Sequence, residues 1–262
     1  MRGSLHSHKP VATPRRLPLN LLQKVVVALN RLLKMNCRFR ARGQKKGFNL
    51  SANVFAIFVF YYCSSKMTKP QIVYFYDVMC GWCYGFGPVV KQLKDEFADR
   101  YDFFIVNAGM VTGGAVKPVA ELADYLEEGA RQVSKMTGAR FGENYEIMLR
   151  VGTCLYSSEM PGKAHVLFKN LHLEGAFEFA HDLQKALFLD GKDLNKPETY
   201  GPLVAPHGLD AADFTEKLQQ PEAEALAREE FEMVSKSGVA GYPTLLVGHK
   251  GHYQPIARGY QR

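Results

Sequence analysis

The residues of this chain best suited to chemistry are two cysteines, Cys80 and Cys83, which are separated by a glycine and Trp82. They stand where an apolar run ends and a helical pattern begins, and cysteines at this spacing can close a small disulfide ring. The unpaired N–H groups and the positive dipole end of a helix N-terminus favour the thiolate form of the first sulfur. Because the thiolate is the form that attacks disulfides, we expect Cys80 to attack. Cys83, one helical turn further in, should be more buried and act as the resolving thiol.

Two other uses of this pair have to be weighed against redox chemistry. A structural zinc site needs four ligands, usually two such pairs or one pair with spaced histidines. The remaining cysteines (Cys37, Cys63 and Cys154) form no second pair, and no H-x3-5-H spacing occurs from Asp77 onward. An inert buried pair is the other alternative. We favour the redox site, expect no metal ligands, and expect Cys154 to be a buried structural thiol.

Hydrophobic patterning predicts the elements that position the pair. Residues 71–76 are typical of a central strand covered on both faces. Residues 83–97 show the spacing of a helix, with Pro88 in its second turn, and residues 103–106 form a second buried strand. A strand, a helix and a strand of these lengths make a βαβ unit, so the two strands are expected to be parallel.

The second half of the chain is expected to be mainly helical. From about residue 117 to residue 236 only helical periodicity occurs, with breaks at Pro161 and at later glycines and prolines. Asp210 is a plausible N-cap. Two strands, at about 244–247 and 253–256, end the chain, and Pro255 indicates that the last is an edge strand. Helices are expected over 118–136, 164–173, 177–189, 210–218 and 222–234.

The chain divides sharply by charge. Residues 1–76 hold 14 of the 33 Lys and Arg and no Asp or Glu, whereas the rest carries a net charge of about −7. An acidic globular part does not favour a nucleic-acid surface. For residues 1–66 we expect a mis-assigned start, with translation beginning at Met67 and a cytoplasmic protein. A secretory signal or membrane anchor, which implies a periplasmic or membrane-anchored protein, and a transit peptide are the alternatives.

The motifs together resemble the DsbA-type branch of the thioredoxin superfamily over about residues 71–261. Three features carry the resemblance: the C-G-W-C sequence after a strand, Pro88 five residues past the second cysteine, and the Gly-Tyr-Pro-Thr sequence at 241–244 before a strand. Cys83 and Pro243 are 160 positions apart, too far for a plain thioredoxin, and the helical stretch between them resembles the inserted helical domain of DsbA-like proteins. The sequence D-x-x-C-x-W-C-Y-G-F at 77–86 looks like the branch of predicted protein-disulfide isomerases, relatives of FrnE.

This resemblance implies an α/β, thioredoxin-like fold over residues 67–262, with a large inserted helical domain at about 115–236. It also implies that Pro243 is cis and lies against the cysteines. Tyr242 and Pro243 should then present a backbone edge to an extended substrate. Trp82 is expected to shape the substrate surface or to pack. Asp77 is expected to shuttle a proton to Cys83 or, alternatively, to cap a turn or helix.

The expected function is thiol–disulfide oxidoreductase or isomerase chemistry on protein or small-thiol disulfides. No cofactor is required, and glutathione is a plausible thiol partner. The Gly-Trp dipeptide differs from that of thioredoxin and of DsbA, so the direction of electron flow stays open. A glutathione-dependent isomerase or transferase and a non-catalytic peptide-binding adaptor are the alternatives.

Overall fold

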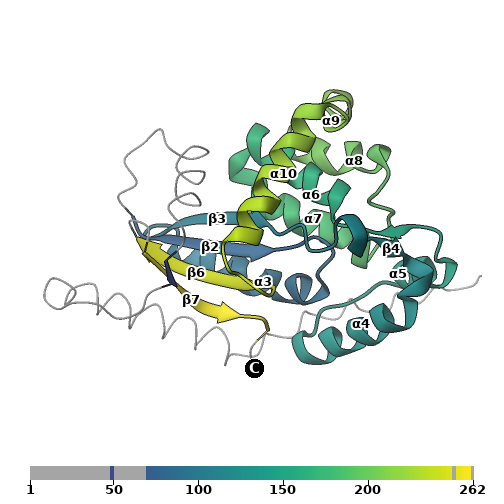
Figure 1. Cartoon of the computed structure of the whole chain (residues 1–262), viewed down its shortest axis with the longest axis horizontal. Helices are drawn as coiled ribbons and strands as arrows, with labels where there is room; N and C mark the ends of the chain where they lie inside the picture. The colour runs from purple at the N-terminus through teal and green to yellow at the C-terminus, as the bar shows by residue number, and fades with distance from the viewer. Residues whose placement is uncertain (1–47, 50–68, 250–251, 261–262) are drawn as a thin grey trace, which may run out of the picture.

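A five-stranded mixed sheet forms the centre of the computed structural model, which describes residues 48–49, 69–249 and 252–260 (Figure 1). The strands are β1 Phe48–Asn49, β2 Gln71–Tyr76, β3 Asp102–Asn107, β6 Thr244–His249 and β7 His252–Arg258. Their order across the sheet is β1-β7-β6-β2-β3. Strands β2 and β3 are parallel, as predicted, and every other neighbouring pair is antiparallel.

Alternation along β2 divides the core into two layers. Ile72, Tyr74 and Tyr76 belong to the large cluster that contains the helix after β2, whereas Val73 and Phe75 pack with Met233 and Val234 on the opposite face. All six residues of β2 are buried. A strand buried on both faces explains why this segment shows an almost continuous apolar run.

Helices cover both faces of the sheet and fill the chain between β3 and β6 (Figure 1). Helix α10 crosses one face, and α3 lies on the other. Between α4 and α6, a two-stranded sheet pairs β4 Lys117–Pro118 with β5 Leu155–Tyr156. The helices are α3 Gly81–Phe97, α4 Ala123–Thr137, α5 Glu143–Val151, α6 Glu159–Leu171, α7 Ala176–Phe188, α8 Gly201–Val204, α9 Ala211–Leu218 and α10 Pro221–Lys236.

Two helix starts differ by five residues from the sequence predictions. The helix expected from residue 118 begins only at Ala123, because Lys117 and Pro118 pair with β5 and Val119 N–H donates to the Cys154 carbonyl. Helix α6 begins five residues before the predicted start and includes Pro161, which was expected to be a break. Proline is tolerated in the first turn, where its missing N–H has no intrahelical partner to lose.

Other local predictions are confirmed. The Asp210 side chain caps α9 by accepting a hydrogen bond from Asp213 N–H. His249 of β6 pairs with His252 of β7, so the two predicted last strands are neighbours in the sheet. The prediction that the last strand is an edge strand, by contrast, is wrong, because β1 pairs with the start of β7 and places β7 between β1 and β6; Pro255 lies outside the short pairing with β1. The predictions for residues 1–66 concern residues that, apart from β1, lie outside the described part of the chain.

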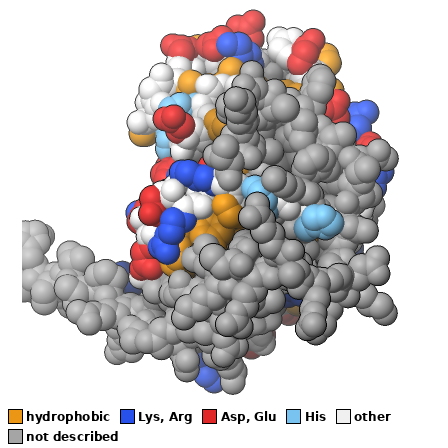
Figure 2. Space-filling model, turned by 90° about the vertical axis from the view of Figure 1, so that its left-hand side faces the viewer, with side chains coloured by type: hydrophobic (Ala, Val, Ile, Leu, Met, Phe, Trp, Pro, Cys, Tyr) orange, Lys and Arg blue, Asp and Glu red, His pale blue; other side chains and the backbone are white. Residues whose placement is uncertain are grey.

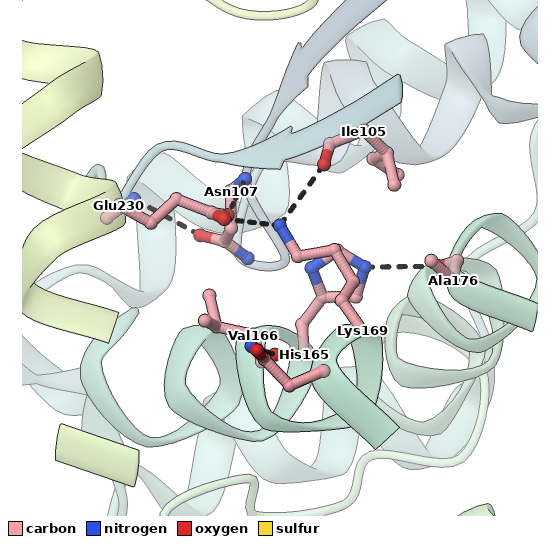
Figure 3. A network of polar contacts seen from close by, with 9 residues as sticks. Ile105, Asn107, His165, Val166, Lys169, Ala176 and Glu230 are labelled. Atoms are coloured by element: carbon pink, nitrogen blue, oxygen red, sulfur yellow. Dashed lines mark hydrogen bonds and ion pairs between the residues drawn. The ribbon is translucent and has the colours of Figure 1, made fainter. Parts of the chain in front are cut away.

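The outer edge of β3 is covered by a buried ion pair instead of another strand (Figure 3). Lys169 of α6 donates to the Ile105 carbonyl at 3.2 Å, and Glu230 of α10 accepts from Asn107 N–H at 2.7 Å. Lys169 and Glu230 also pair with each other, with side chains only 6% and 14% exposed. An exposed strand edge is a site for unwanted pairing, and here side chains from two helices bond one carbonyl and one N–H of that edge.

Within the described residues, no helix is both long enough and apolar enough to span a membrane. One end of the molecule is shown in Figure 2, where the described Lys and Arg side chains are interspersed with Asp and Glu around a small hydrophobic area. This face therefore presents mixed charge within its described part.

Candidate active site

The two cysteines lie at the N-terminus of α3, with Cys80 as its N-cap. Cys83 N–H donates to Cys80 Sγ at 3.2 Å, so the first sulfur accepts one of the N–H groups that a helix start leaves unpaired. Cys80 is 6% exposed, and Cys83 is fully buried. Both are free thiols in this structure. The arrangement matches the predicted order of an outer and a more buried sulfur.

The surroundings of Cys83 keep its proton in place. Burial raises the pKa of the Cys83 thiol well above its ordinary value, and the hydrogen bond and negative charge of Cys80 raise it further. Cys83 is thus held as a thiol. The environment therefore suits the two sulfurs to different steps of disulfide exchange.

A loop from the far end of the sequence reaches the same sulfur. The Tyr242–Pro243 peptide bond is cis, as expected. The Cys80 thiol donates to the Tyr242 carbonyl at 3.8 Å, which places this loop directly against the attacking position. Tyr242 itself is half-buried, and burial raises the pKa of its phenol to about 12. The structure thus brings together Cys80, Cys83, Tyr242 and Pro243.

Asp77 lies just before the cysteines, and its carboxylate binds three separate segments. Oδ1 accepts from Met79 N–H at 2.9 Å and from the Ser158 hydroxyl at 2.7 Å, and Oδ2 accepts from Met110 N–H at 2.7 Å. These bonds join the turn before Cys80 to the loop after β3 and to the start of α6. The contacts are those of a turn-holding carboxylate, while proton transfer to Cys83 stays a prediction.

Exchange of Asp77 for asparagine is expected to change the pH dependence of stability. Burial raises the pKa of Asp77 above 3.8, although its hydrogen bonds oppose this shift. A raised pKa in the folded state stabilises the fold fully below the unfolded pKa, and this stabilisation is lost as pH rises through the folded pKa. The free energy of unfolding of the unmodified protein, minus that of Asp77→Asn, should therefore increase as pH falls from 7 to 4.

Urea titrations of both proteins across this pH range would measure that difference. The contributions of the other carboxylates are present in both proteins and cancel when the two free energies of unfolding are subtracted. A difference that stays constant, or that decreases toward acid, would contradict the raised pKa. Glu159→Gln provides the control, since this nearby carboxylate is exposed and holds only Gly113 N–H.

Trp82 packs on the C-terminal segment of the chain. Its ring lies 5.5 Å from the ring of Tyr260, and the Tyr260 hydroxyl donates to the Met136 carbonyl of α4 at 3.0 Å. Trp82 is half-buried, so one part of the side chain stays accessible beside Cys80. Its role in substrate binding stays a prediction.

Helix α4 approaches α3 closely because Gly85 has no side chain. A Cβ at Gly85 would lie only 2.7–2.9 Å from side-chain atoms of Thr137 and Val133. Phe141, after α4, lies against Gly81, between the two cysteines. The segment between β3 and β6 therefore forms one wall of the site and does not stand apart from it.

Sequence reasoning missed two groups at this site. Ser158, which binds Asp77, and Tyr74, whose hydroxyl donates to the Cys83 carbonyl at 3.4 Å, were assigned no role. The hydroxyls of Tyr74 and Tyr76 in a mainly apolar strand were the available signal, and the sequence does not tell which of them reaches Cys83. Cys154 is half-buried rather than buried. Among the described residues, no cluster of three or more His, Cys, Asp or Glu could hold a metal ion.

Comparisons with known proteins agree with this geometry. Residues 71–262 match the DSBA-like thioredoxin domain. A putative protein disulfide isomerase from Nitrosomonas europaea is 25% identical, with a TM-score of 0.63 over 74% of this chain and 91% of that one. The cytosolic disulfide reductase DsbM from Pseudomonas aeruginosa has the same fold, at 24% identity and a TM-score of 0.63 over 71% of this chain and 89% of that one.

A third similar protein is named as an adapter and not as a disulfide isomerase or reductase. The ClpXP adapter protein SpxH from Bacillus subtilis is 23% identical over 197 residues, which are 74% of this chain and 63% of the relative. The chain thus spans less than two thirds of the length of the curated relatives it matches. The family match extends from β2 through both cysteines and the cis-proline loop to the end of the chain. The chain therefore belongs to the DSBA-like thioredoxin domain family.

Proposed function

We propose that this protein is a thiol–disulfide oxidoreductase that works by dithiol–disulfide exchange at Cys80 and Cys83. The observation that carries the proposal is the 3.2 Å hydrogen bond from Cys83 N–H to Cys80 Sγ at the start of α3. It stabilises negative charge on the attacking sulfur and keeps the second sulfur within one helical turn. Membership of the DSBA-like family supports the same chemistry.

The exchange proceeds in two balanced steps. The Cys80 thiolate attacks one sulfur of a disulfide R–S–S–R′, so that a Cys80–S–S–R bond forms and R′–S⁻ leaves. Cys83 then loses its proton and attacks Cys80 Sγ, which forms the Cys80–Cys83 disulfide and releases R–S⁻. Two electrons pass from the protein to the substrate, and the reverse sequence oxidises a dithiol.

The substrate must reach a sulfur that is only 6% exposed. A small disulfide or an extended peptide segment can do so, whereas the flat surface of a folded protein cannot. We propose that Tyr242 and Pro243 present the backbone edge for such a segment and that Trp82 lines the approach. Glutathione is the proposed small-thiol partner, and no other cofactor takes part.

Equilibration of the full chain in mixtures of reduced and oxidised glutathione, followed by alkylation and mass analysis, tests the proposal. A disulfide between Cys80 and Cys83 is the expected product. A potential near that of thioredoxin, about −270 mV, would indicate a reductase, whereas one near that of DsbA, about −120 mV, would indicate an oxidase. If no intramolecular disulfide forms at any ratio, dithiol exchange is wrong.

A non-catalytic adapter is the second candidate, and the name of the SpxH relatives favours it. An adapter would bind its partner through surfaces that do not need a reactive sulfur. Partner capture that survives Cys80→Ser, without measurable disulfide exchange by the unmodified chain, would favour this function. A glutathione-dependent isomerase or transferase would instead keep its activity in Cys83→Ser, because it needs one sulfur only.

A further inference from the structure

Tyr74 is a buried hydroxyl beside the resolving cysteine. It lies in β2 and is 4% exposed. Its hydroxyl donates to the Cys83 carbonyl at 3.4 Å. Its ring stacks on Tyr76 at 5.6 Å and meets Phe86 at 6.2 Å. These neighbours hold the phenol beside the first turn of α3.

The phenol keeps its proton at every working pH. Burial raises the pKa of Tyr74 well above 10.0, and negative charge on Cys83 and on Cys80 raises it further, as does a hydrogen bond with the Cys83 side chain. A hydroxyl in this state cannot accept a proton as a base. Its one contribution is to donate a hydrogen bond, and a nearby negative sulfur is the strongest acceptor available to it.

Asp77, unlike a hydrogen-bond donor, disfavours a thiolate at Cys83. Its negative charge raises the pKa of Cys83, and its oxygens already accept hydrogen bonds from Met79, Met110 and Ser158. The other ionisable groups that face Cys83 are Cys80 at the helix start, Tyr76 on β2 and Tyr242 in the cis-proline loop. A negative Cys80, like Asp77, opposes a thiolate at Cys83.

We propose that the Tyr74 hydroxyl donates a hydrogen bond to Cys83 Sγ when Cys83 becomes a thiolate, and so accelerates resolution of the mixed disulfide. This inference rests on the proposed dithiol exchange. In the step concerned, Cys83 releases its proton to the buffer and its sulfur attacks Cys80 Sγ. The Cys80–Cys83 bond forms, and the substrate sulfur leaves with the electron pair of the broken bond. Tyr74 keeps its own proton throughout.

Tyr76 offers a matched control on the same strand. It is two residues away, faces the same layer of the core, and is also fully buried, but its hydroxyl has no hydrogen-bond partner within the described structure. Tyr76→Phe and Tyr74→Phe each remove one buried hydroxyl from β2. Only the second removes a hydrogen bond to Cys83.

Ellman's reagent, 5,5′-dithiobis(2-nitrobenzoate), separates the two steps of exchange in stopped flow. The full chain is used with Cys37, Cys63 and Cys154 replaced by serine, so that only the active-site pair reacts. Attack by Cys80 releases the first chromophore, and attack by Cys83 on the mixed disulfide releases the second. Rates are measured between pH 5 and 9 for this parent and for each tyrosine variant.

Tyr74→Phe should leave the first phase within about twofold, slow the second phase about tenfold, and move its pH midpoint up by about one unit, as expected for loss of a hydrogen bond to a charged group. Tyr76→Phe should match the parent in both phases. Equal rates of the second phase in Tyr74→Phe and Tyr76→Phe would overturn the role of Tyr74. Equal slowing of both phases by Tyr74→Phe would also overturn it, because that result indicates structural damage. A parent that shows no second phase would instead refute the proposed dithiol exchange.

Discussion

Cys80→Ser is expected to reduce the rate of disulfide exchange by a factor on the order of 10³ or more, as losses of catalytic nucleophiles do. The serine hydroxyl stays protonated at neutral pH, so the helix start has no anionic nucleophile to stabilise. The measurement is the transfer of reducing equivalents from glutathione to a disulfide-bonded fluorescent peptide, with the full chain at pH 7. The rate should fall to that of glutathione alone.

Cys154→Ser is the matched control, because it removes a half-buried thiol near β5 without touching the start of α3. Its exchange rate should stay within about twofold of that of the unmodified protein. Burial raises the pKa of the Cys154 thiol, which makes this thiol a poor nucleophile. Cys83→Ser should stop at a mixed disulfide that carries one glutathione, visible by mass. A Cys80→Ser protein that retains the activity, or a Cys154→Ser protein that loses it, would place the reactive sulfur elsewhere.

Lys169→Met is expected to reduce the free energy of unfolding by about 3–5 kcal/mol, the usual result of leaving one member of a buried ion pair unpaired. The change isolates the charge of Glu230 and removes the donor to the Ile105 carbonyl at the edge of β3. At this chain length the melting temperature should fall by about 10 °C. Thermal and urea denaturation followed by circular dichroism would measure both quantities.

Two further variants identify the cause of this loss. Lys217→Met breaks an exposed pair with Asp213, with side chains 46% and 54% exposed, and should cost less than about 1 kcal/mol. The double variant Lys169→Met with Glu230→Gln should recover more than half of the loss, because no buried charge is left and the glutamine oxygen can still accept from Asn107 N–H. If Lys169→Met is as stable as Lys217→Met, the pair of Lys169 and Glu230 does not hold the edge of β3.

The ion pair at β3 matters for function because the same strand leads to the active site. Asn107 ends β3, and the loop that follows supplies Met110 N–H to the Asp77 carboxylate. Helices α6 and α10 therefore fix the loop that holds the turn before Cys80. Loss of Lys169 should thus disturb Asp77 as well as the stability of the sheet.

Prediction from the sequence succeeded for elements whose structure depends only on residues close together in the chain. The apolar run at β2, the helical periodicity of α3 and the cap at Asp210 need no information from distant residues. Prediction was wrong where pairing with a segment far away in the chain determines the secondary structure. Pro118 became a strand residue because β5 was available to pair with it, although its neighbours show helical periodicity.

The candidate site shows the same division. The spacing of Cys80 and Cys83 was sufficient to predict the outer and the buried sulfur, and the resemblance to DsbA-like proteins implied the loop at Pro243 beside them. Tyr74 could not be assigned a role, because alternation along a strand tells which face a side chain is on but not which atom it meets. The partners of Asp77 come from three segments and have no signal in the sequence.

The sequence by itself determined the β2-α3-β3 unit, the two last strands and the spacing of Cys80 and Cys83, because these follow from residue type and short-range patterns. Only the tertiary structure decided which groups surround that pair. The donor at Cys83, the hydrogen bonds that hold Asp77, and the ion pair of Lys169 with Glu230 all join residues far apart in the chain. Such contacts depend on how helices pack against the sheet, and that packing is set by the whole core rather than by any local pattern.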